Sequence, residues 1–581
     1  MKFNSGLALI AIISTTFISA CGSSSVPINV SVTPSAAAIG TGQTSRFAAE
    51  VSDGSAVAWS ASTGTIDNTG NYTAPSGAQS VTVTVTATST KDRAKSASAT
   101  VNVVAPGQVA ATDNVQVALY SISPAAAGKV SVQFGMDTSY ALTTWAQPVP
   151  QGAGPVSLFV AGMKGNTLYH MRGVVQFSDG SQYMDPDMMF TTGAYPTAQE
   201  PSLTATTTAG MTPQSGVELL DLVNGGATVA PGVVTDLEGN ILWSYNPGIT
   251  TTLNPIKLLP NGHMMLNFSA GATDGASSIL QEVDLSGKLI WQMTAADLNT
   301  ALAAASCTGC NITVIGTHHD FLMLPNGHLI LLAATQQPIS GTTLTGDVLI
   351  DLDQNHKPVW LWNEFDHLDT SRHPMGGLDW THTNAVIYSP DDGNLIISIR
   401  HQNWLVKVDY NNGAGAGDII WKLGYQGDFT LVGGTDPTDW FYAEHGPSFA
   451  TTNTTGKFSL IVFDNGNDRT LPTGQVQCVS TASPTCYSTV PLLELDETAK
   501  TATLAFHDVF TSFSYFGGNA GVLNNGDVEF CVTNGPEVHE VTQDSNAKQV
   551  WSILASKDPT GAFPDLYRGQ RMPSLYPGVQ W

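Results

Sequence analysis

Histidines are concentrated in the middle of this chain. Thirteen occur among 581 residues, and nine of them lie between His318 and His445. Most histidines in a β-rich protein are satisfied structural groups, so their position relative to predicted hairpin turns selects the candidates. His319 precedes the Asn-Gly turn of its hairpin by seven residues, and His382 precedes Asp391 by nine. The two therefore occupy similar places in successive repeats.

The segment that carries His382 supplies further polar candidates. Asn384 lies two residues later, and strand side chains alternate, so we expect it to share a face with His382. Folding the hairpin about Asp391 brings Arg400 within a cross-strand or diagonal step of His382. The next repeat carries a histidine at a similar place. We therefore predict that five residues converge on one site: His319, His382, Asn384, Arg400 and His445.

Two neighbours of this set are candidates for supporting roles. Adjacent strand residues point in opposite directions, so only one of His318 and His319 is expected to enter the site. Folding the next hairpin about Thr454 places Asp464 near His445, where a carboxylate could orient the imidazole ring.

All the leading candidates are hydrogen-bond donors, and none is a carboxylate. Such a set suits an oxyanion such as sulfate or phosphate. Ca²⁺ and Mg²⁺ prefer several oxygen ligands, and a guanidinium beside Zn²⁺ is unfavourable, so we expect no metal and no cofactor. Cys307 and Cys310, close to the histidine pair, are alternatively half of a zinc site, although no second CxxC or HxxxH completes it.

A repeat from about residue 197 onward indicates which elements position these residues. One half is an apolar strand, an Asn/Asp-Gly turn and a second strand, which is a hairpin signal. The copies are KLLPNGHMMLNF from Lys257, LMLPNGHLILLA from Leu322, VIYSPDDGNLIISI from Val386 and VLNNGDVEFCV from Val522.

The other half of the repeat is an aspartate, a turn and a tryptophan. The offset is seven residues in three copies and longer in a fourth: Asp236 to Trp243, Asp284 to Trp291, Asp353 to Trp360, and Asp409 to Trp421. Degenerate copies begin at Leu492 and His539, which makes six. Six four-stranded units predict an all-β, six-bladed β-propeller over residues 197–581, with the candidates at the channel mouth and the tryptophans between blades.

Two segments that precede the propeller read as β-sandwich domains. Residues 27–104 carry short alternating runs such as VTVTVTAT and resemble a bacterial Ig-like module. Residues 105–196 continue this style, and TLYHMRGVVQF resembles a strand of a fibronectin type III domain. Neither segment contains a cluster of polar candidates, so both are expected to be spacers or binding modules.

The N-terminus predicts export. Residues 1–20 are expected to form a signal peptide ending in Ile18-Ser19-Ala20, followed by Cys21 in a context that resembles the lipobox of bacterial lipoproteins. Cys21 is then a lipid anchor, residues 21–26 are a linker, and the protein is held at the outer membrane, facing the periplasm or the cell surface. The alternative is an ordinary signal peptide with an incidental cysteine.

An exported chain meets an oxidising compartment, so short-range cysteine pairs are expected to form disulfides. The candidate pairs are Cys307 with Cys310 and Cys478 with Cys486, which leaves Cys531 unpaired.

Composition excludes some functions. The 22 Lys+Arg and 47 Asp+Glu residues give a net charge of −25, and no basic cluster is present, so a nucleic-acid partner is disfavoured. Only 12% of residues are charged, while 56 Gly and 31 Pro indicate many turns. An apolar content of 42% excludes wholesale disorder.

Three segments together resemble the bacterial arylsulfotransferases, also called aryl-sulfate sulfotransferases. They are HHDFLMLPNGHL from His318, DWTHTNAVIYSPDDGNLIISIRHQ from Asp379, and AEHGPS from Ala443 followed by LIVFDNGNDR from Leu460. The resemblance covers about residues 200–581 and implies a six-bladed propeller preceded by a β-sandwich, in agreement with the repeat count.

The resemblance also implies an activity. Members of this family move a sulfuryl group from a phenolic sulfate ester to a phenol without a nucleotide donor, and no GxxxxGK[ST] phosphate-binding signature occurs here. By matching position, His445 is the residue that becomes sulfated in a ping-pong reaction. Arg400 and Asn384 would hold the sulfuryl oxygens, and His319 or His382 would transfer the proton.

Two other functions remain open at the level of sequence. A surface-anchored propeller with sandwich modules could bind glycans or proteins without catalysis, because fold alone does not decide function. An aryl-sulfate hydrolase would use the same residues with water as acceptor. The expected partners are small phenolic sulfates and phenols, the membrane through the lipid anchor, and a second copy of the chain in a homodimer.

Overall fold

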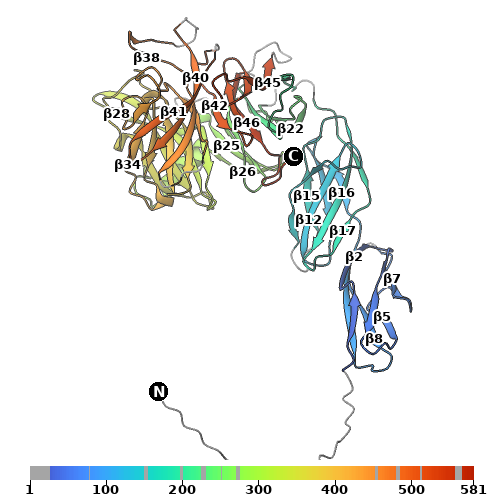
Figure 1. The fold of residues 1–581 in the computed structure, drawn as a ribbon. Coiled ribbons are helices and arrows are strands. Elements are labelled where there is room, and N and C mark those ends of the chain that lie inside the picture. Colours follow the sequence, from blue (N-terminus) through green and yellow to red (C-terminus); the bar gives the residue numbers. More distant parts are fainter. Residues whose placement is uncertain are drawn as a thin grey trace, which may run out of the picture.

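The computed structural model describes residues 27–581 except 78, 150–154, 197–199, 224–230, 250, 270–274, 452–453, 455, 479–484, 511–512 and 557–564. The predicted signal peptide, Cys21 and the linker lie outside the described residues. Two β-sandwich domains lie in line beside a β-propeller (Figure 1). Within the described ranges, no helix is long and apolar enough to cross a membrane.

The first sandwich packs sheets around a core that contains Phe47, Tyr72, Val83 and Val101. One sheet has the order β2-β9-β8-β5, and the others are β1-β4 and β3-β7-β6. The strands are β1 (Val30–Thr33), β2 (Ala36–Gly40), β3 (Thr44–Arg46), β4 (Ala48–Val51), β5 (Val57–Ala61), β6 (Thr65–Ile66), β7 (Asn71–Thr73), β8 (Val81–Ser89) and β9 (Ser96–Val104). Along β8 the threonines Thr82 and Thr84 are exposed while Val83 and Val85 are buried, which is the alternation expected of a half-buried strand.

The second sandwich has one sheet of order β10-β11-β15 and one built on β13-β12-β16-β17, where β14 pairs with β12 and β18 with β16. Its strands are β10 (Gln108–Ala111), β11 (Ala118–Ile122), β12 (Gly128–Gly135), β13 (Leu142–Thr143), β14 (Gln147–Val149), β15 (Val156–Val160), β16 (Leu168–Phe177), β17 (Gln182–Met184) and β18 (Met188–Thr191). The resemblance of the two sandwiches to Ig-like and fibronectin modules stays a prediction.

Six four-stranded sheets make up the rest of the chain and confirm the predicted six-bladed propeller. From the innermost strand outward, the first three blades are β46 (Asp565–Met572), β20 (Val217–Val223), β21 (Gly232–Thr235), β22 (Ile241–Tyr245); β23 (Leu253–Leu258), β24 (Met264–Phe268), β25 (Ile279–Val283), β26 (Leu289–Thr294); and β27 (Val314–Met323), β28 (Leu329–Ile339), β29 (Thr342–Leu352), β30 (Pro358–Asn363).

The other three blades follow the same plan. They are β31 (Thr383–Ser389), β32 (Asn394–Ile399), β33 (Trp404–Val408), β34 (Ile419–Leu423); β36 (His445–Phe449), β37 (Lys457–Phe463), β40 (Ser488–Asp496), β41 (Thr501–Phe510); and β42 (Asn519–Val522), β43 (Val528–Val532), β44 (Glu537–Val541), β45 (Gln549–Ser556). β35 (Thr430–Val432) extends the fifth blade and β19 (Ser202–Thr207) the sixth.

Short elements occur between the blade strands. They are η2 (Gly275–Ser277), α1 (Ala295–Ala304), η3 (Glu364–Asp366), η4 (Arg400–Gln402), η5 (Asn411–Gly413), and the strands β38 (Thr470–Leu471) and β39 (Gly474–Gln475). The helix α1 starts at a capping box, in which Thr294 and Asp297 each bind the other's backbone N–H.

The predicted Asn-Gly turns join the first and second strands of their blades. In each of three turns the asparagine Oδ1 accepts a bond from the backbone N–H two residues later, at 3.0 Å, and the glycine has a φ of 81°, 82° or 91°. A left-handed φ favours glycine, which explains why the sequence repeats it. These glycines are Gly262, Gly327 and Gly526.

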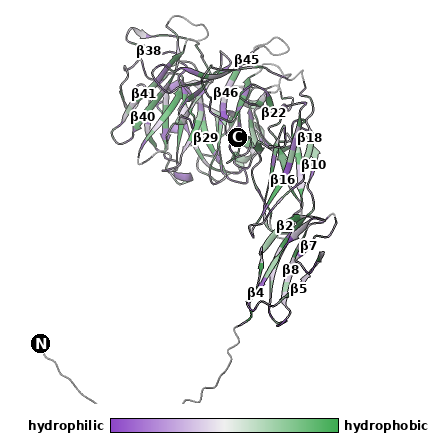
Figure 2. Ribbon diagram, turned by 45° about the vertical axis from the view of Figure 1, so that its right-hand side comes forward, coloured by the Kyte–Doolittle hydropathy of each residue, from purple (hydrophilic) through white to green (hydrophobic). Residues whose placement is uncertain are grey.

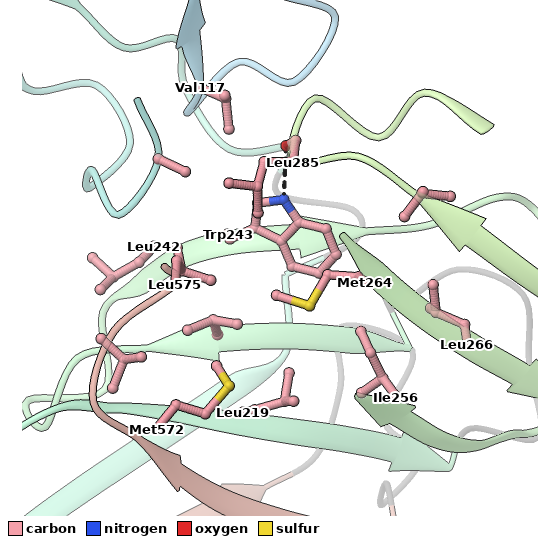
Figure 3. Packing of buried hydrophobic residues seen from close by; sticks show 14 of the residues in the cluster. Val117, Leu219, Leu242, Trp243, Ile256, Met264, Leu266, Leu285, Met572 and Leu575 are labelled. Atoms are coloured by element: carbon pink, nitrogen blue, oxygen red, sulfur yellow. Dashed lines mark hydrogen bonds between the residues drawn. The ribbon is translucent and has the colours of Figure 1, made fainter. Parts of the chain in front are cut away.

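The repeated aspartate and tryptophan have separate functions. Asp284 Oδ1 accepts bonds from the N–H groups of Ser286 and Lys288, which closes the turn before the outer strand. Trp243 is fully buried, and its indole N–H donates to the carbonyl of Leu285 in the next blade at 2.9 Å (Figure 3). Trp421 and Trp551 also donate to the blade that follows, so the predicted position between blades is confirmed.

The third blade uses a neighbouring tryptophan for this contact. Trp362 is buried and donates to the carbonyl of Gly417 in the following blade at 2.7 Å, while Trp360 is only half-buried and contacts the Tyr410 ring. Hydrophobic residues line strands of the propeller such as β29 in the third blade and β40 in the fifth (Figure 2).

The second sandwich packs directly on the propeller. Val117 and Ala161 of the sandwich share one hydrophobic cluster with Trp243 and Leu575 of the propeller side. The Tyr576 hydroxyl donates to the carbonyl of Phe159 at 2.9 Å, and the Trp581 indole donates to the carbonyl of Thr143 at 2.8 Å. The segment after β46 therefore binds the two domains together.

The ring closes through β46, which pairs with β20 from the other end of the domain. Arg571 on β46 lies among three buried glutamates of two blades: its Nε donates to Glu218 at 2.9 Å, its Nη1 lies 3.0 Å from Glu540, and its Nη2 lies 3.6 Å from Glu529. Three carboxyl groups thus surround one guanidinium. Burial raises the pKa of Glu218 well above its ordinary value of 4.5, and the charge of Glu529 adds to this shift.

This cluster predicts that stability falls as the pH rises above about 4.5. A carboxyl group with a raised pKa in the folded state binds its proton more tightly there than in the unfolded chain. The free energy of unfolding therefore falls by about 1.4 kcal/mol per pH unit as the pH rises towards the pKa of the folded state. Glu218→Gln keeps an oxygen for Arg571 and removes the titration. We expect its melting temperature to exceed that of the wild type increasingly between pH 5 and 8. Parallel pH profiles in calorimetry would contradict this assignment.

Candidate active site

The three candidate histidines lie on or beside the innermost strands of three successive blades: His319 within β27, His382 directly before β31 and His445 at the start of β36. The backbone is irregular at each of these places, because His319, His382 and Ala443 have left-handed φ values of 57°, 53° and 54°. The pairing registers also shift beside them, at Thr317/Phe321, Thr383/Ala385 and His445/Ser448. Such conformations are costly for residues with a Cβ and concentrate at functional sites.

His445 is held in one tautomer. Its side chain is buried, and Nδ1 lies 2.7 Å from Asn465 Oδ1. The Asn465 amide nitrogen donates to the carbonyls of Ser514 and Gly517, so the amide oxygen must face the ring and Nδ1 must carry the hydrogen. Nε2 therefore bears the lone pair, and it accepts a bond from the Gly517 N–H at 3.2 Å.

The prediction that Asp464 orients this ring is wrong. Asp464 accepts bonds from the N–H of Tyr442, the Thr489 hydroxyl and the Arg469 guanidinium. The pairing register places Phe463 opposite His445, and the side chain that reaches the imidazole comes from Asn465, one residue beyond the predicted position.

His319 and His382 meet face to edge, with ring centroids 4.7 Å apart and 3.2 Å between their Nε2 atoms. His382 Nδ1 lies 2.5 Å from Asp379 Oδ2, and the His319 ring centroid lies 6.4 Å from that of His445. The His382 side chain is 18% exposed, whereas His319 is buried, so solvent reaches the cluster from the His382 side.

His318 and His319 do not point to opposite faces as strand alternation predicted. Their Nδ1 atoms lie 2.8 Å apart, because the bulge between Thr317 and Phe321 and the left-handed φ of His319 interrupt the alternation. His319 is the member that contacts the other site histidines. His318 is fully buried behind it, with Nε2 2.8 Å from Asp347 Oδ1.

Arg400 comes directly after β32, whose pairing of Ile399 with Thr383 places it beside His382 as the hairpin count predicts. Nη1 donates to His401 Nε2 at 2.7 Å and Nη2 to the Tyr515 carbonyl at 3.0 Å. Nε is buried and has no hydrogen-bond partner among the described residues. The guanidinium is thus fixed at two nitrogens and retains a donor.

Asn384 is also buried within this region. Its amide nitrogen donates to the carbonyl of Glu444, immediately before His445, at 2.6 Å. One N–H of the amide remains, while Oδ1 has no partner among the described residues. Asn384 therefore fixes the backbone next to His445 and has a single donor left.

Burial controls the charge state of the rings. It lowers the pKa of His445 well below 6.5, and the nearby Arg400 charge adds to the shift. Burial likewise lowers the pKa of His319 well below 6.5 and that of His401 to about 3, with His382 contributing to both. These three imidazoles are neutral at pH 7. Burial also raises the pKa of Glu444, so its carboxyl group is neutral beside Arg400.

One set of described residues has the spacing of a metal site. The ligand atoms of Asp379, His382 and His401 lie within 4.8 Å of one another. Both His401 nitrogens are engaged, because Nδ1 lies 2.6 Å from the Asp379 carbonyl and Nε2 accepts from Arg400. A divalent cation here would meet the guanidinium and break these bonds, so the set fits a metal poorly.

The cysteines form the two predicted disulfides, Cys307–Cys310 and Cys478–Cys486, and Cys531 is free and buried. The alternative of half a zinc site at Cys307 and Cys310 is excluded, since both sulfurs are consumed. The second disulfide lies in the segment that leads from Asn465 back to β40, and the Asn467 amide donates to the Cys478 carbonyl there at 3.0 Å.

Comparison with known proteins identifies the lineage of the propeller. Residues 197–551 match the family model described as "Arylsulfotransferase (ASST)", which covers more than half of the chain. The chain belongs to the arylsulfotransferase family. This arylsulfotransferase therefore has, at the level of its family, aryl sulfotransferase activity with phenolic sulfates and phenols as substrates. The match ends before β46, the strand that closes the ring.

Other comparisons add little to the assignment of this arylsulfotransferase. No curated protein matches its sequence. A crystal structure of a protein from Lactobacillus plantarum is similar at 10% identity over 77% of this chain and 99% of that one, with a TM-score of 0.33. An ICAM-5 D1–D4 ectodomain fragment is similar at 11% identity over 56% of this chain and 100% of that one, with a TM-score of 0.17. These scores are too low to support an argument.

Several residues of the arylsulfotransferase site were not predicted from sequence. Asn465, Asp379 and His401 each contact a predicted site residue, and Gly517 donates to His445 from the sixth blade's side of the mouth. His401 directly follows Arg400, and Asp379 stands three residues before His382. Both could have been found by asking which neighbours hold the leading residues in place.

Proposed function

We propose that this arylsulfotransferase moves a sulfuryl group from a phenolic sulfate ester to a phenol in two steps through a sulfohistidine at His445. The observation that carries the proposal is the fixed tautomer of His445: Asn465 holds Nδ1–H, which leaves a lone pair on Nε2 of a neutral ring. A neutral imidazole nitrogen is a competent nucleophile without prior loss of a proton.

In the first step, His445 Nε2 attacks sulfur, its contact with the Gly517 N–H gives way, and the bond from sulfur to the phenolic oxygen breaks. Charge on the three sulfuryl oxygens needs fixed donors. The free Nε–H of Arg400 and the remaining N–H of Asn384 support that role.

The His319 and His382 pair supplies the proton. The two Nε2 atoms are directed towards each other and share a hydrogen at the mouth. A phenolic oxygen that approaches this contact receives that hydrogen as the ester breaks. In the second step the acceptor phenol returns a proton to the pair, attacks sulfur and frees His445 Nε2. Neither step consumes a nucleotide.

The lipid anchor at Cys21 and placement at the outer membrane belong to the same proposal and rest on the sequence alone. They would keep the enzyme where exported phenols and sulfate esters reach it.

The reaction is tested by incubating the purified protein with a chromogenic aryl sulfate, with and without an added phenol. Release of the chromophore that depends on the phenol, with the sulfated phenol as product, supports transfer. Release independent of the phenol, with inorganic sulfate as product, would make the protein a hydrolase. No release across a panel of donors would leave a non-catalytic binding propeller.

A further inference from the structure

A continuous row of acids and imidazoles runs from the mouth of the site into the third blade. Asp379, His382, His319, His318 and Asp347 follow one another at separations of 2.5, 3.2, 2.8 and 2.8 Å. At the last separation the His318 N–H is not aligned with the oxygen, but neither atom has another hydrogen-bond partner among the described residues. We call these five residues the histidine row.

The number of hydrogens in the row follows from counting its contacts. Each of the four contacts joins two atoms that can share only one hydrogen, and all of them are short enough to need one. Three neutral imidazoles carry three N–H hydrogens. Four filled contacts between two carboxylates and three rings therefore require one hydrogen more than the neutral rings possess.

The structure assigns the histidine row as a store for one catalytic proton, in which buried His318 and Asp347 act through His319 as positioning residues. This inference rests on the proposed sulfuryl transfer and goes beyond it. The proton that leaves with the first phenol does not belong to a single ring, because shifting hydrogens through neutral His319 moves the charge between His382 and His318.

The inner end of the row is Asp347, whose two carboxyl oxygens have different partners. Its Oδ2 accepts bonds from the Thr381 hydroxyl at 2.8 Å and the Thr383 N–H at 2.7 Å, which leaves Oδ1 for His318. At the outer end burial alone would raise the pKa of Asp379, but its contact with His382 lowers it well below 3.8. The contact between His382 and Asp379 thus favours a positive charge on the row.

The surrounding charges balance this extra proton. Arg400 adds one positive charge, while burial keeps His401 and His445 neutral and raises the pKa of Glu364 well above 4.5. Glu364 accepts from the Thr383 hydroxyl, and Tyr567, whose ring faces His319, stays neutral because burial raises its pKa. Asp379 and Asp347 thus offset Arg400 and one proton on the row.

The row explains how one site serves both steps. Before the first step the hydrogen between the His319 and His382 Nε2 atoms is available to the departing phenolic oxygen. After this hydrogen has left, each ring keeps one N–H. The His382 Nδ1–H donates to Asp379, the His319 Nδ1–H donates to His318, and the His318 Nε2–H points to Asp347. Both Nε2 lone pairs then face the acceptor phenol, whose O–H hydrogen refills the contact as its oxygen bonds to sulfur.

The first test does not depend on activity. Solid-state NMR of the wild-type protein with ¹⁵N-labelled histidine at pH 7 reports whether any ring carries hydrogens on both nitrogens. We expect one imidazolium in the unliganded protein and its loss in Asp347→Asn. Three neutral rings in the row would overturn the inference even if the enzyme transfers sulfate.

The second test uses the acidity of the leaving phenol. His318→Asn retains an amide donor for His319 but cannot hold a charge. We expect turnover of phenyl sulfate, whose phenolate needs a proton, to fall by roughly 10²-fold to 10³-fold, and that of p-nitrophenyl sulfate by less than about tenfold. His328→Asn is the matched control, since His328 pairs with Asp351 in the same blade at 3.0 Å outside the site.

An equal loss for the two esters would reduce His318 to a structural residue and overturn its part in the row. If His318→Asn does not fold, Asp347→Asn is read in the same assay. A wild-type protein that turns over neither ester would refute the proposed function, and the NMR measurement would still decide the proton count.

Discussion

His445→Ala is expected to lower sulfuryl transfer by roughly 10⁴-fold or more, because it removes the only nucleophile of the proposed two-step reaction. Labelling with a ³⁵S aryl sulfate should leave the wild-type protein with an acid-labile, base-stable sulfated histidine and the variant with none. His373→Ala is the matched control, since His373 is exposed and contacts only the Thr370 carbonyl among the described residues. Full labelling of His445→Ala would move the nucleophile to another residue.

Asn465→Ala provides a finer version of the same experiment. The nucleophile remains, but nothing holds its Nδ1–H, so the ring samples the wrong tautomer and orientation. We expect a loss of roughly tenfold to 10²-fold in kcat with sulfohistidine still formed, more slowly. A variant as fast as the wild type would show that the Gly517 contact alone positions the ring.

Arg400→Ala should reduce kcat/KM by roughly 10²-fold to 10³-fold, the effect of removing one fixed donor from a developing oxyanion. Arg400→Lys should recover little, because a lysine ammonium cannot contact His401 and the Tyr515 carbonyl and also present the donor that Nε provides. Initial rates with saturating phenol and varied aryl sulfate measure the effect.

The Arg400 experiment needs a control for net charge. Arg93→Ala removes a positive charge from an exposed position in the first sandwich and leaves the propeller unchanged. The protein carries a net charge of −25, so its overall field repels an anionic ester, and the attraction must come from nearby donors. Equal losses in Arg93→Ala and Arg400→Ala would mean that long-range charge, rather than contact, limits binding.

The sequence was informative wherever a local rule acts alone. The Asn-Gly turns need a left-handed glycine, the aspartate turns need a side-chain acceptor, and tryptophans such as Trp243 pack against the next blade, so all three recur at readable spacing. Counting along the hairpin also placed Arg400 beside His382, because Thr383 still pairs with Ile399 although the register shifts by one residue between Thr383 and Ala385.

Prediction failed where the strands depart from regular pairing. The bulge beyond Thr317 brought His318 against His319, and the shift after His445 exchanged Asp464 for Asn465 as the residue on the ring. Tertiary packing also decides which groups can carry charge: Asp347 reaches the row from β29 and the Tyr567 ring from β46, and neither stands near the histidines in sequence. Periodicity gives no information about such long-range contacts.

The closing strand gives this enzyme an order of assembly. β46 is synthesised after all other propeller strands, yet it is the innermost strand of the blade that begins with β20, about 350 residues earlier. Pairing of strands that are so far apart in the sequence is slow, and the other five blades keep unpaired edges until β46 has paired. Tyr567 and Arg568 also reach the channel only with this strand, so the propeller is expected to stay inactive until β46 has paired with β20.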